Sequence, residues 1–479
     1  MAVDGQKPHA ILVAYPLQGH VIPSVQLALK LASRGFTITF LNTQSIHHQT
    51  SVAHAGGDAD LDIFAGVRRS GLDIRYTTVP DGLPRDFDRS LHHDQFMAAL
   101  LHVFSAHVEE AVRRIVQSSP NVTSLIADTF FVWPAAIAKK FDLLYVSFWT
   151  EPALVFALYY RMDLLRKNGH FACHDIREDK IDYIPGVEAI DPKDMPSYLQ
   201  HPDPSPATVC HQIIFKAFAA VRSADLVLCN TVQELEPATV SALRARIQFY
   251  AVGPLSFARG GVATSLWSEH DCTPWLDSIS PASVLYVSFG SYAHVARREL
   301  EEVAEGLRLS GVPFLWVIRP DIVSSGDAAA DPLPAGFREE IGGRGVVVPW
   351  CLQVEVLEHP AVGGFLTHCG WNSVVESVGR GVPLLCFPLL TDQFSNRRLV
   401  VEDWRVGIDL TRRRGRVERA EVSDGVRRLM GGGEEIRRRV QRLRLIVENA
   451  LTPPHGSSTI NFDRFTADLE QAAQRRGAH

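Results

Sequence analysis

The chain has 479 residues, of which 46% are hydrophobic and 21% charged, and its formal net charge is −6. This composition is that of a globular protein with enough chain for two domains, and its acidic balance argues against nucleic acid or an anionic membrane as a partner. The first residues lack a basic and then apolar leader, and no run approaches the roughly 18 apolar residues of a spanning helix.

The first half of the chain alternates short apolar runs with amphipathic segments. The run AILVAYP (10–16) predicts a strand, and the helix expected after it carries Val21, Val25, Ala28 and Ala32 on one face. Further strands are expected at 36–43, 124–130, 143–149 and 224–231. Strands that are apolar throughout and alternate with helices predict a parallel sheet covered on both faces.

The alternation stops at 250–265, where Gly, Pro, Ser and Ala favour a linker, and then restarts. Strands are expected in SVLYVSFGS (283–291), PFLWVIRP, GVVVPW, VGGFLTH and VPLLCFP. We therefore predict an α/β protein with two doubly wound, Rossmann-like domains that face each other across a cleft. The expected boundaries are an amino-terminal domain at 1–250, a linker at 251–272, a second domain at 273–455 and a terminal helix at 456–479, whose docking place the sequence leaves open.

The stretch HCGWNSVVES (368–377) joins an expected strand to an expected helix. A helix start offers free N–H groups and a partial positive charge, so this turn is a candidate phosphate site. Gly370 permits close approach of the backbone, and His368, Asn372 and Ser373 add polar side chains. An ordinary strand–helix turn capped by Asn or Ser is the alternative interpretation.

Residues on either side of this stretch favour a nucleotide-sugar site. The ring of Trp350 is suited to stack a nucleobase, and Gln353 follows closely. Glu376 is placed to accept hydrogen bonds from ribose hydroxyls. Asp392 and Gln393 follow a further strand and pair a carboxylate with an amide, a combination suited to sugar hydroxyls.

Residues 350–393, from Trp350 to Gln393, resemble the secondary-product glycosyltransferase signature of plant UDP-dependent glycosyltransferases, without a gap. The resemblance extends along the chain through PLQGHVIPSVQLALKLASRG, LIADTFFVWPAAIAKKF, NTVQELEP, YAVGPL and VLYVSFGS. It implies a GT-B fold with an amino-terminal acceptor domain and a carboxy-terminal donor domain. It also implies inverting, metal-independent transfer from a UDP-sugar to a small lipophilic acceptor, with no cofactor beside the donor.

The resemblance assigns donor contacts by position. It implies that Trp350 stacks uracil while the Cys351 backbone pairs with the base edge, and that Gln353 and Glu376 hold the ribose. It also implies that the phosphates are bound by His368, Asn372, Ser373 and Ser291, and that the sugar is bound by Trp371, Asp392 and Gln393. The family often has Ala-Pro where Cys351-Leu352 stand and Phe-Ala where Leu390-Thr391 stand. A terminal glutamine in this box is associated with UDP-glucose, so Gln393 favours glucose.

His20 is the candidate base, because it follows the first strand and histidine accepts protons near neutral pH. Asp128, at the end of the fourth strand, is suited to orient the imidazole and stabilise its cation. An N-cap role is the alternative for Asp128. The family's His–Asp dyad matches both positions. Thr150 matches a position that often touches the donor sugar, with a helix cap as its alternative.

Two other functions remain open from the sequence: a sugar-nucleotide epimerase, and a UDP-sugar-binding protein without transferase activity. Transfer to oxygen is the default, with nitrogen and carbon as alternatives. The acceptor, expected to be a flavonoid, terpenoid, hormone or other phenol, is set by segments near 45–95 and 165–210, which we expect to be irregular. Phe130, Phe131, Phe148 and Trp149 either line its pocket or pack in the core.

Two remaining features argue against other partners. The basic runs at 411–416 and 436–444 are read as solvated surface rather than as a nucleic-acid site, since the second has an apolar helix face. Seven scattered cysteines without a Cys-x-x-Cys pair predict neither disulfides nor a metal site and favour a reduced, cytoplasmic setting.

Overall fold

The computed structural model describes residues 7–55, 61–173, 177–200, 208–255, 262–323, 331–410 and 416–477. The chain forms two compact units. Unit 1 comprises Met1–Pro192, Tyr198–Leu266 and Ala450–His479, and unit 2 comprises Lys193–Ser197 and Trp267–Asn449. The short segment Lys193–Ser197 therefore packs with the second unit. Among the described helices, none combines the length and the apolar character needed to cross a membrane.

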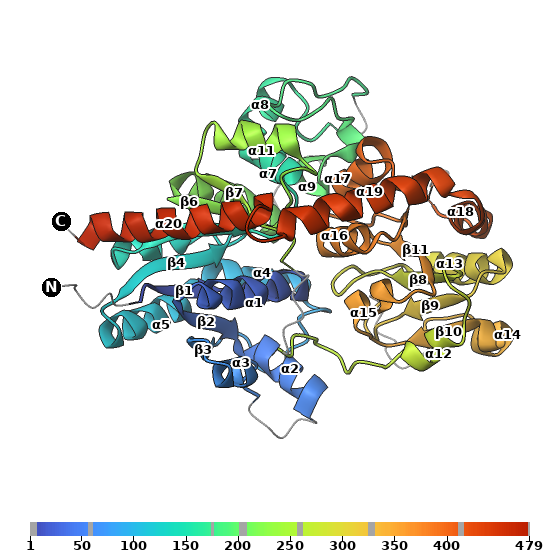
Figure 1. Ribbon diagram of the computed structural model, residues 1–479, viewed down its shortest axis with the longest axis horizontal. Coiled ribbons are helices and arrows are strands. Elements are labelled where there is room, and N and C mark those ends of the chain that lie inside the picture. Colours follow the sequence, from blue (N-terminus) through green and yellow to red (C-terminus); the bar gives the residue numbers. More distant parts are fainter. Residues whose placement is uncertain are drawn as a thin grey trace. The chain divides into compact units, whose positions relative to one another are not determined.

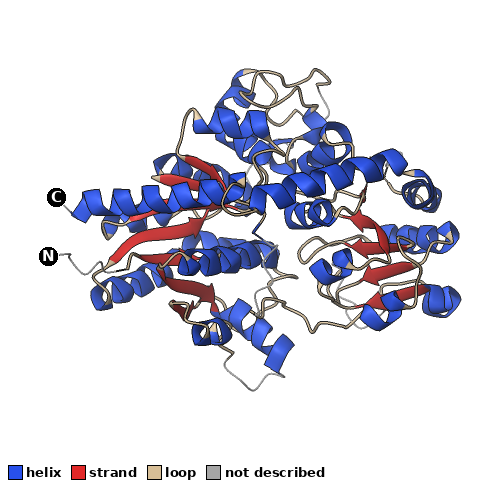
Figure 2. Cartoon of the chain, viewed as in Figure 1, coloured by secondary structure: helices blue, strands red, loops and turns tan. Residues whose placement is uncertain are grey.

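Unit 1 is built on a parallel sheet of seven strands within the described residues, in the order β3-β2-β1-β4-β5-β6-β7. Figure 2 shows these strands with helices packed around them. The strands are β1 (His9–Val13), β2 (Thr37–Thr43), β3 (Ile74–Val79), β4 (Val122–Asp128), β5 (Leu144–Trp149), β6 (Leu226–Cys229) and β7 (Phe249–Ala251). The helices are α1 (Gln18–Ser33), α2 (Gln44–Ala55), α3 (Ala65–Arg69), α4 (His93–His102), α5 (Phe104–Ser118), α6 (Pro134–Lys140), α7 (Ala153–Tyr160), α8 (Met162–Lys167), α9 (Ser197–Gln200, whose first residue belongs to unit 2), α10 (Val209–Ala220), α11 (Pro237–Arg244) and α20 (Ser457–Gly477).

The central strand β1 shows why its sequence is apolar throughout. Ala10 and Leu12 pack into the apolar cluster that includes α1, whereas Ile11 and Val13 pack into the cluster that includes α4 and α5. Successive strand residues point to opposite faces, so a strand covered on both sides needs apolar residues at every position. The predicted parallel sheet with two covered faces is therefore confirmed.

The strand order also places the ends of β1 and β4 side by side. The chain winds outward from β1 toward β3 and then returns to β4 on the other side of β1. This reversal is the switch point of a doubly wound sheet, where ligands bind at the carboxyl ends of the strands. His20 lies just beyond β1 and Asp128 ends β4, so both candidate catalytic residues come from this point.

The carboxy-terminal helix α20 packs on unit 1, beside β7 (Figure 1). The Tyr250 hydroxyl donates to Asp468 Oδ2 at 2.6 Å, and Asn461 Nδ2 donates to the Ala251 carbonyl at 2.9 Å. Phe465 lies against Tyr250 with 5.6 Å between ring centroids. Phe462, Phe465 and Leu469 of α20 also pack into the apolar cluster that includes α1. The terminal helix thus has the docking place that the sequence left open.

Unit 2 contains a second parallel sheet, in the order β10-β9-β8-β11-β12-β13 among its described strands. The strands are β8 (Val284–Ser288), β9 (Phe314–Val317), β10 (Gly345–Val348), β11 (Val362–Thr367), β12 (Leu384–Cys386) and β13 (Gly407–Asp409). The helices are α12 (Thr273–Asp277), α13 (Arg297–Ser310), α14 (Phe337–Ile341), α15 (Gln353–Glu358), α16 (Trp371–Arg380), α17 (Gln393–Arg398), α18 (Arg419–Gly432) and α19 (Glu434–Leu451). The switch point lies between β8 and β11, where Ser288 pairs with Thr367.

The structure differs from the sequence expectations mainly at sheet edges and in the segments assigned to the acceptor. The edge strands β3, β7 and β13 were not predicted. The segment 45–95, expected to be irregular, contains most of α2 together with α3, β3 and the start of α4. Residues 56–60, 174–176 and 201–207 of the two acceptor segments, 256–261 of the expected linker and 411–415 of the first basic run lie outside the described residues.

Candidate active site

In unit 1, the structure brings His20, Asp128 and Thr150 together. His20 Nδ1 lies 2.8 Å from Asp128 Oδ2 and 2.9 Å from the Thr150 hydroxyl oxygen. The Asp128 side chain is 1% exposed and the His20 side chain 14%, so the carboxylate is enclosed while the ring reaches the surface. Because Asp128 engages Nδ1, Nε2 is the nitrogen left to take a proton from a ligand.

The local fold positions both partners of His20. Asp128 Oδ1 accepts the N–H of Phe130 at 2.9 Å, so the carboxylate holds the turn after β4 as well as the imidazole. Thr150 follows β5, and the N-cap of α7 is Pro152 rather than Thr150. The buried carboxylate of Glu236 accepts the first N–H groups of α7, at Ala153 and Leu154, and fixes that helix start. Sequence reasoning missed Glu236, whose signal is the motif NTVQELEP.

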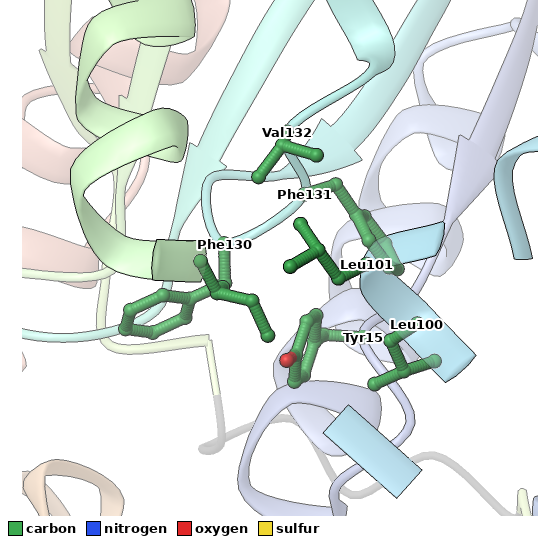
Figure 3. A pocket seen from close by; sticks show the side chains of 7 residues that line it. Tyr15, Leu100, Leu101, Phe130, Phe131 and Val132 are labelled. Carbon is green, nitrogen blue, oxygen red and sulfur yellow. The ribbon is translucent and has the colours of Figure 1, made fainter. Parts of the chain in front are cut away.

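A small apolar hollow, which has no enclosed room for a water molecule, lies beside the His20 ring. Figure 3 shows its lining side chains gathered from the loop after β4, from α4 and from Tyr15. It is lined by Tyr15, Leu100, Leu101, Phe130, Phe131, Val132 and Ile213. The rings of Tyr15 and Phe130 lie 5.4 and 5.5 Å from the His20 ring, centroid to centroid. The hollow therefore places apolar surface next to a potential base.

Two of the four aromatic residues considered for an acceptor pocket line this hollow, and two do not. Phe130 and Phe131 belong to its wall. Phe148 is 1% exposed and Trp149 fully buried, and the Trp149 indole donates to the Pro152 carbonyl at 2.9 Å. Phe148 and Trp149 are therefore core residues.

In unit 2, the two residues assigned to ribose contact each other. Gln353 Nε2 donates to Glu376 Oε2 at 2.7 Å and to the Ser373 hydroxyl at 3.0 Å. The Tyr286 hydroxyl donates to Gln353 Oε1 at 3.3 Å. These bonds connect the starts of α15 and α16 with β8. The cluster therefore presents a carboxylate, an amide and a hydroxyl in one place, a set that can exchange hydrogen bonds with a diol.

The candidate base platform, Trp350, lies against a second tryptophan that sequence reasoning missed. Trp267 packs on Trp350 with 4.6 Å between ring centroids and 32° between ring planes. The N–H of His270 also donates to the Trp350 carbonyl at 2.9 Å. A hydrogen bond with Cys272, together with burial, raises the pKa of the neighbouring Cys351 thiol. The Cys351 side chain is thus engaged inside the unit, consistent with a ligand contact through its backbone.

The candidate phosphate turn is shaped around the ring of His368, which follows β11. A Cβ atom on Gly290 would lie 2.5 Å from His368 Cε1, and one on Gly370 would lie 2.4 Å from Nε2. Both positions therefore require glycine. Burial, with the Arg319 guanidinium acting in the same direction, lowers the pKa of His368 to about 3, so the ring is uncharged near neutrality. Its buried Nδ1 has no hydrogen-bond partner within the described residues.

Helix α16 begins at this turn, with Gly370 as its N-cap and therefore with no capping side chain. Asn372 and Ser373 lie in its first turn, and the helix dipole directs partial positive charge toward the His368 ring. Ser291 follows Gly290 after the neighbouring strand β8. These residues thus converge at the switch point of the second sheet, as an anion site would require.

Arg319 supports this turn and was also missed by sequence reasoning. Its side chain is 1% exposed, and Nη1 donates to the Gly290 carbonyl at 2.7 Å. A second guanidinium nitrogen donates to the Ala293 carbonyl, and Nε donates to Asp321 Oδ1 at 2.8 Å. Its position at the end of the apolar run PFLWVIRP was the available signal, because a buried cation at a strand end needs a structural or ligand-directed reason.

The candidate sugar residues lie around the start of α17. Gln393 Oε1 accepts the N–H groups of Leu389 and Leu390, at 2.8 and 3.0 Å. The amide oxygen is therefore occupied, and the Gln393 amide nitrogen is the group left to face a ligand. Trp371 is 3% exposed, with its ring 6.2 Å from that of Trp404. Its side chain is thus as buried as those of Asp392 and Gln393, and its contact with the sugar stays a prediction.

The chain is similar to known proteins over nearly its full length. The family model for UDP-glucoronosyl and UDP-glucosyl transferase matches residues 254–418. The chain is 55% identical to UDP-glycosyltransferase 86A1 of Arabidopsis thaliana, over 98% of this chain and 96% of that one. It is 34% identical to (R)-mandelonitrile beta-glucosyltransferase of Prunus dulcis, over 97% of each chain. The structure of Phytolacca americana UGT2, complexed with UDP-2fluoro-glucose and pterostilbene, matches with a TM-score of 0.78 at 26% identity, over 97% of this chain and 100% of that chain.

Proposed function

Because the chain belongs to the plant family of UDP-glycosyltransferases, with a GT-B fold, we propose that it transfers glucose from UDP-glucose to a hydroxyl of a small lipophilic acceptor. The proposal extends to inversion at the anomeric carbon, which yields a β-glucoside. The observation that carries it is the hydrogen bond between His20 and Asp128 beside an apolar hollow. This arrangement offers a proton acceptor next to a surface suited to an aromatic or aliphatic ring.

In the proposed reaction, His20 Nε2 takes the proton of the acceptor hydroxyl as its oxygen attacks the anomeric carbon. The new bond joins that oxygen to the carbon, the bond from the carbon to the UDP oxygen breaks, and UDP leaves with the electron pair. Asp128 stabilises the imidazolium through Nδ1 and holds the ring orientation. The Thr150 hydroxyl is also hydrogen-bonded to His20 Nδ1. This bond supports a role for Thr150 in orienting His20, in addition to the expected contact with the sugar.

The donor is assigned to unit 2. Trp350 supplies a face for uracil, and Gln353 with Glu376 supplies partners for ribose hydroxyls. The groups assigned to the diphosphate are His368, Asn372, Ser373, Ser291 and the start of α16. They would stabilise the negative charge that develops on UDP as it leaves. The His368 ring contributes here as an uncharged group.

The glucose assignment rests on Asp392 and Gln393. The Asp392 carboxylate accepts hydrogen bonds, and Gln393 offers its amide nitrogen as a donor because its oxygen is already occupied. Sugar hydroxyls both donate and accept, so this pair can bind two adjacent hydroxyls in one orientation. The printed name of the Prunus relative, a beta-glucosyltransferase, supports the same sugar and product configuration.

The test is UDP release from UDP-glucose in the presence of phenolic, terpenoid and hormone acceptors, with UDP-galactose in parallel. We expect release that depends on the acceptor and prefers glucose, with the β-configuration of the product read by proton NMR. An α-glucoside would overturn the inverting mechanism. Release of UDP without a glucosylated acceptor would overturn the proposed transfer to an acceptor. Equal use of UDP-glucose and UDP-galactose would overturn the preference for glucose.

A further inference from the structure

The turn that precedes α17 holds one residue in an unusual backbone conformation. Thr391 has φ of 55°, in the left-handed region that β-branched residues rarely adopt. It lies directly before Asp392 and Gln393, the two proposed sugar-binding residues. Such a conformation costs free energy and persists only where neighbouring contacts hold it, and it is found most often at functional sites.

Ser197 supplies contacts that hold this conformation. The Ser197 N–H donates to the Thr391 carbonyl at 3.0 Å, and the Thr391 N–H donates to the Ser197 hydroxyl at 3.0 Å. The two residues thus exchange a reciprocal pair of hydrogen bonds although 194 positions separate them in the chain. Both backbone polar groups of the strained residue are satisfied by a single serine.

The segment Lys193–Ser197 is itself anchored within unit 2. Asp194 is fully buried and forms an ion pair with Arg397 of α17. The Ser395 hydroxyl donates to the Asp194 carbonyl at 2.7 Å. Ser197 is therefore held against the 391–393 turn by contacts with two residues of the helix that follows the turn.

The conformation of Thr391 also determines how Asp392 is presented. The Thr391 hydroxyl donates to Asp392 Oδ1 at 2.7 Å, and Asn396 Nδ2 donates to Asp392 Oδ2 at 2.5 Å. Each carboxylate oxygen therefore accepts a hydrogen bond from this turn or from α17, and the two bonds fix the direction in which the carboxylate points. A change in the Thr391 backbone would move its hydroxyl and would release one side of this carboxylate.

We propose that Ser197 is a positioning residue for the donor sugar: it holds Thr391 in the left-handed conformation and thereby aims Asp392 and Gln393 at the sugar hydroxyls. The proposal rests on the proposed function, because it assigns these two side chains to the sugar. Ser197 itself need not touch the donor. Its effect should consequently fall on the sugar part of UDP-glucose and spare the nucleotide part.

The experiment compares the affinities of UDP and UDP-glucose by calorimetry in the full-length protein, without an acceptor. In Ser197→Ala, we expect the Kd of UDP-glucose to rise about tenfold while the Kd of UDP stays within about twofold of wild type, as the loss of one hydrogen bond and of the geometry it holds predicts. Ser197→Thr keeps the hydroxyl and should restore UDP-glucose binding. Such rescue distinguishes positioning from a general loss of stability.

Ser310→Ala is the matched control, because the Ser310 hydroxyl likewise accepts a backbone N–H, from Val312 at 3.2 Å, in the same unit. This variant should leave both affinities unchanged. Equal weakening of UDP and UDP-glucose in Ser197→Ala, or no change in either, would overturn the proposal. If the wild-type protein bound UDP-glucose no more tightly than UDP, that result would instead refute the assignment of Asp392 and Gln393 to the sugar in the proposed function.

Discussion

The indole ring of Trp267 lies against that of Trp350, with ring centroids 4.6 Å apart and planes inclined by 32°. The proposed uracil platform is thus in contact with Trp267, and it also packs against the apolar cluster that includes Tyr286 and Val356. Trp267 is the first residue of the long segment of unit 2, and its neighbour His270 is hydrogen-bonded to the Trp350 backbone. The chain that enters this unit therefore packs against the residue proposed to stack the nucleotide base.

Replacing Trp267 tests this arrangement. In Trp267→Ala, Trp350 loses its stacking partner and its fixed orientation, so we expect the Kd of UDP to rise about tenfold, the equivalent of one aromatic pair. Trp267→Phe should retain most of the affinity. Trp275→Ala, which removes a partly buried tryptophan bonded to the Gly343 carbonyl in the same unit, is the control and should bind UDP normally. Tighter UDP binding in Trp267→Ala would instead mean that Trp267 occupies the place of the base.

Asp128→Asn tests the dyad. The amide keeps the shape of the carboxylate but cannot stabilise an imidazolium, so we expect kcat to fall about 10³-fold while the Kd of UDP stays unchanged. Asp225→Asn is the matched control, since Asp225 Oδ2 accepts a backbone N–H from Tyr145 at 2.8 Å in the same unit. Its kcat should remain near that of wild type. Loss of UDP binding together with activity in Asp128→Asn would show that Asp128 acts on the fold rather than on the reaction.

The buried His368 ring predicts a dependence of stability on pH. Its pKa is lowered from 6.5 to about 3 in the folded protein, chiefly by burial, so below about pH 6.5 the unfolded chain binds more protons at this residue. The free energy of unfolding should therefore decrease as the pH falls from about 6.5 toward about 3. His9, whose pKa burial lowers to about 4, acts in the same direction. Urea unfolding at several pH values should show that the free energy of unfolding decreases less steeply with falling pH in His368→Asn than in the wild type. Adding His9→Gln should make the decrease shallower still. An unchanged slope in both variants would contradict the prediction.

Much of the fold could be predicted from the sequence because most strands are buried on both faces and read as short apolar runs. The strands that were missed lie at sheet edges. In β3, with the sequence IRYTTV, only the first and last residues are buried, and β7 and β13 have only three residues each. An edge strand is covered on fewer sides, and three residues are too few to show a period. Strand order was likewise beyond the sequence, so the convergence of His20 and Asp128 needed the resemblance as well as the motifs.

The candidate site was also only partly predictable from the sequence. Residues within the continuous stretch 350–393 could be singled out because the residues around them in the sequence are assigned to the same ligand. Trp267, Arg319 and Ser197 could not, because each acts on that stretch from a distant part of the chain. Only pairing in space shows that Trp267 covers Trp350 or that Ser197 holds Thr391. A motif therefore identified the groups proposed to meet the ligand, and the structure was required to find the residues that hold them.

Gly370→Ala tests the phosphate turn by steric means alone. Gly370 has φ of −60° and ψ of 140°, a conformation open to alanine, so the substitution adds no backbone strain. The new Cβ atom would lie 2.4 Å from His368 Nε2 and 3.0 Å from Cε1, which forces the buried ring to move. We expect the Kd of UDP to rise by about tenfold or more, since the ring and the start of α16 would separate. Gly343→Ala, where an added Cβ meets no atom within 4 Å, should bind UDP as wild type does. Wild-type affinity in Gly370→Ala would show that the His368 ring moves freely and takes no part in binding the phosphates.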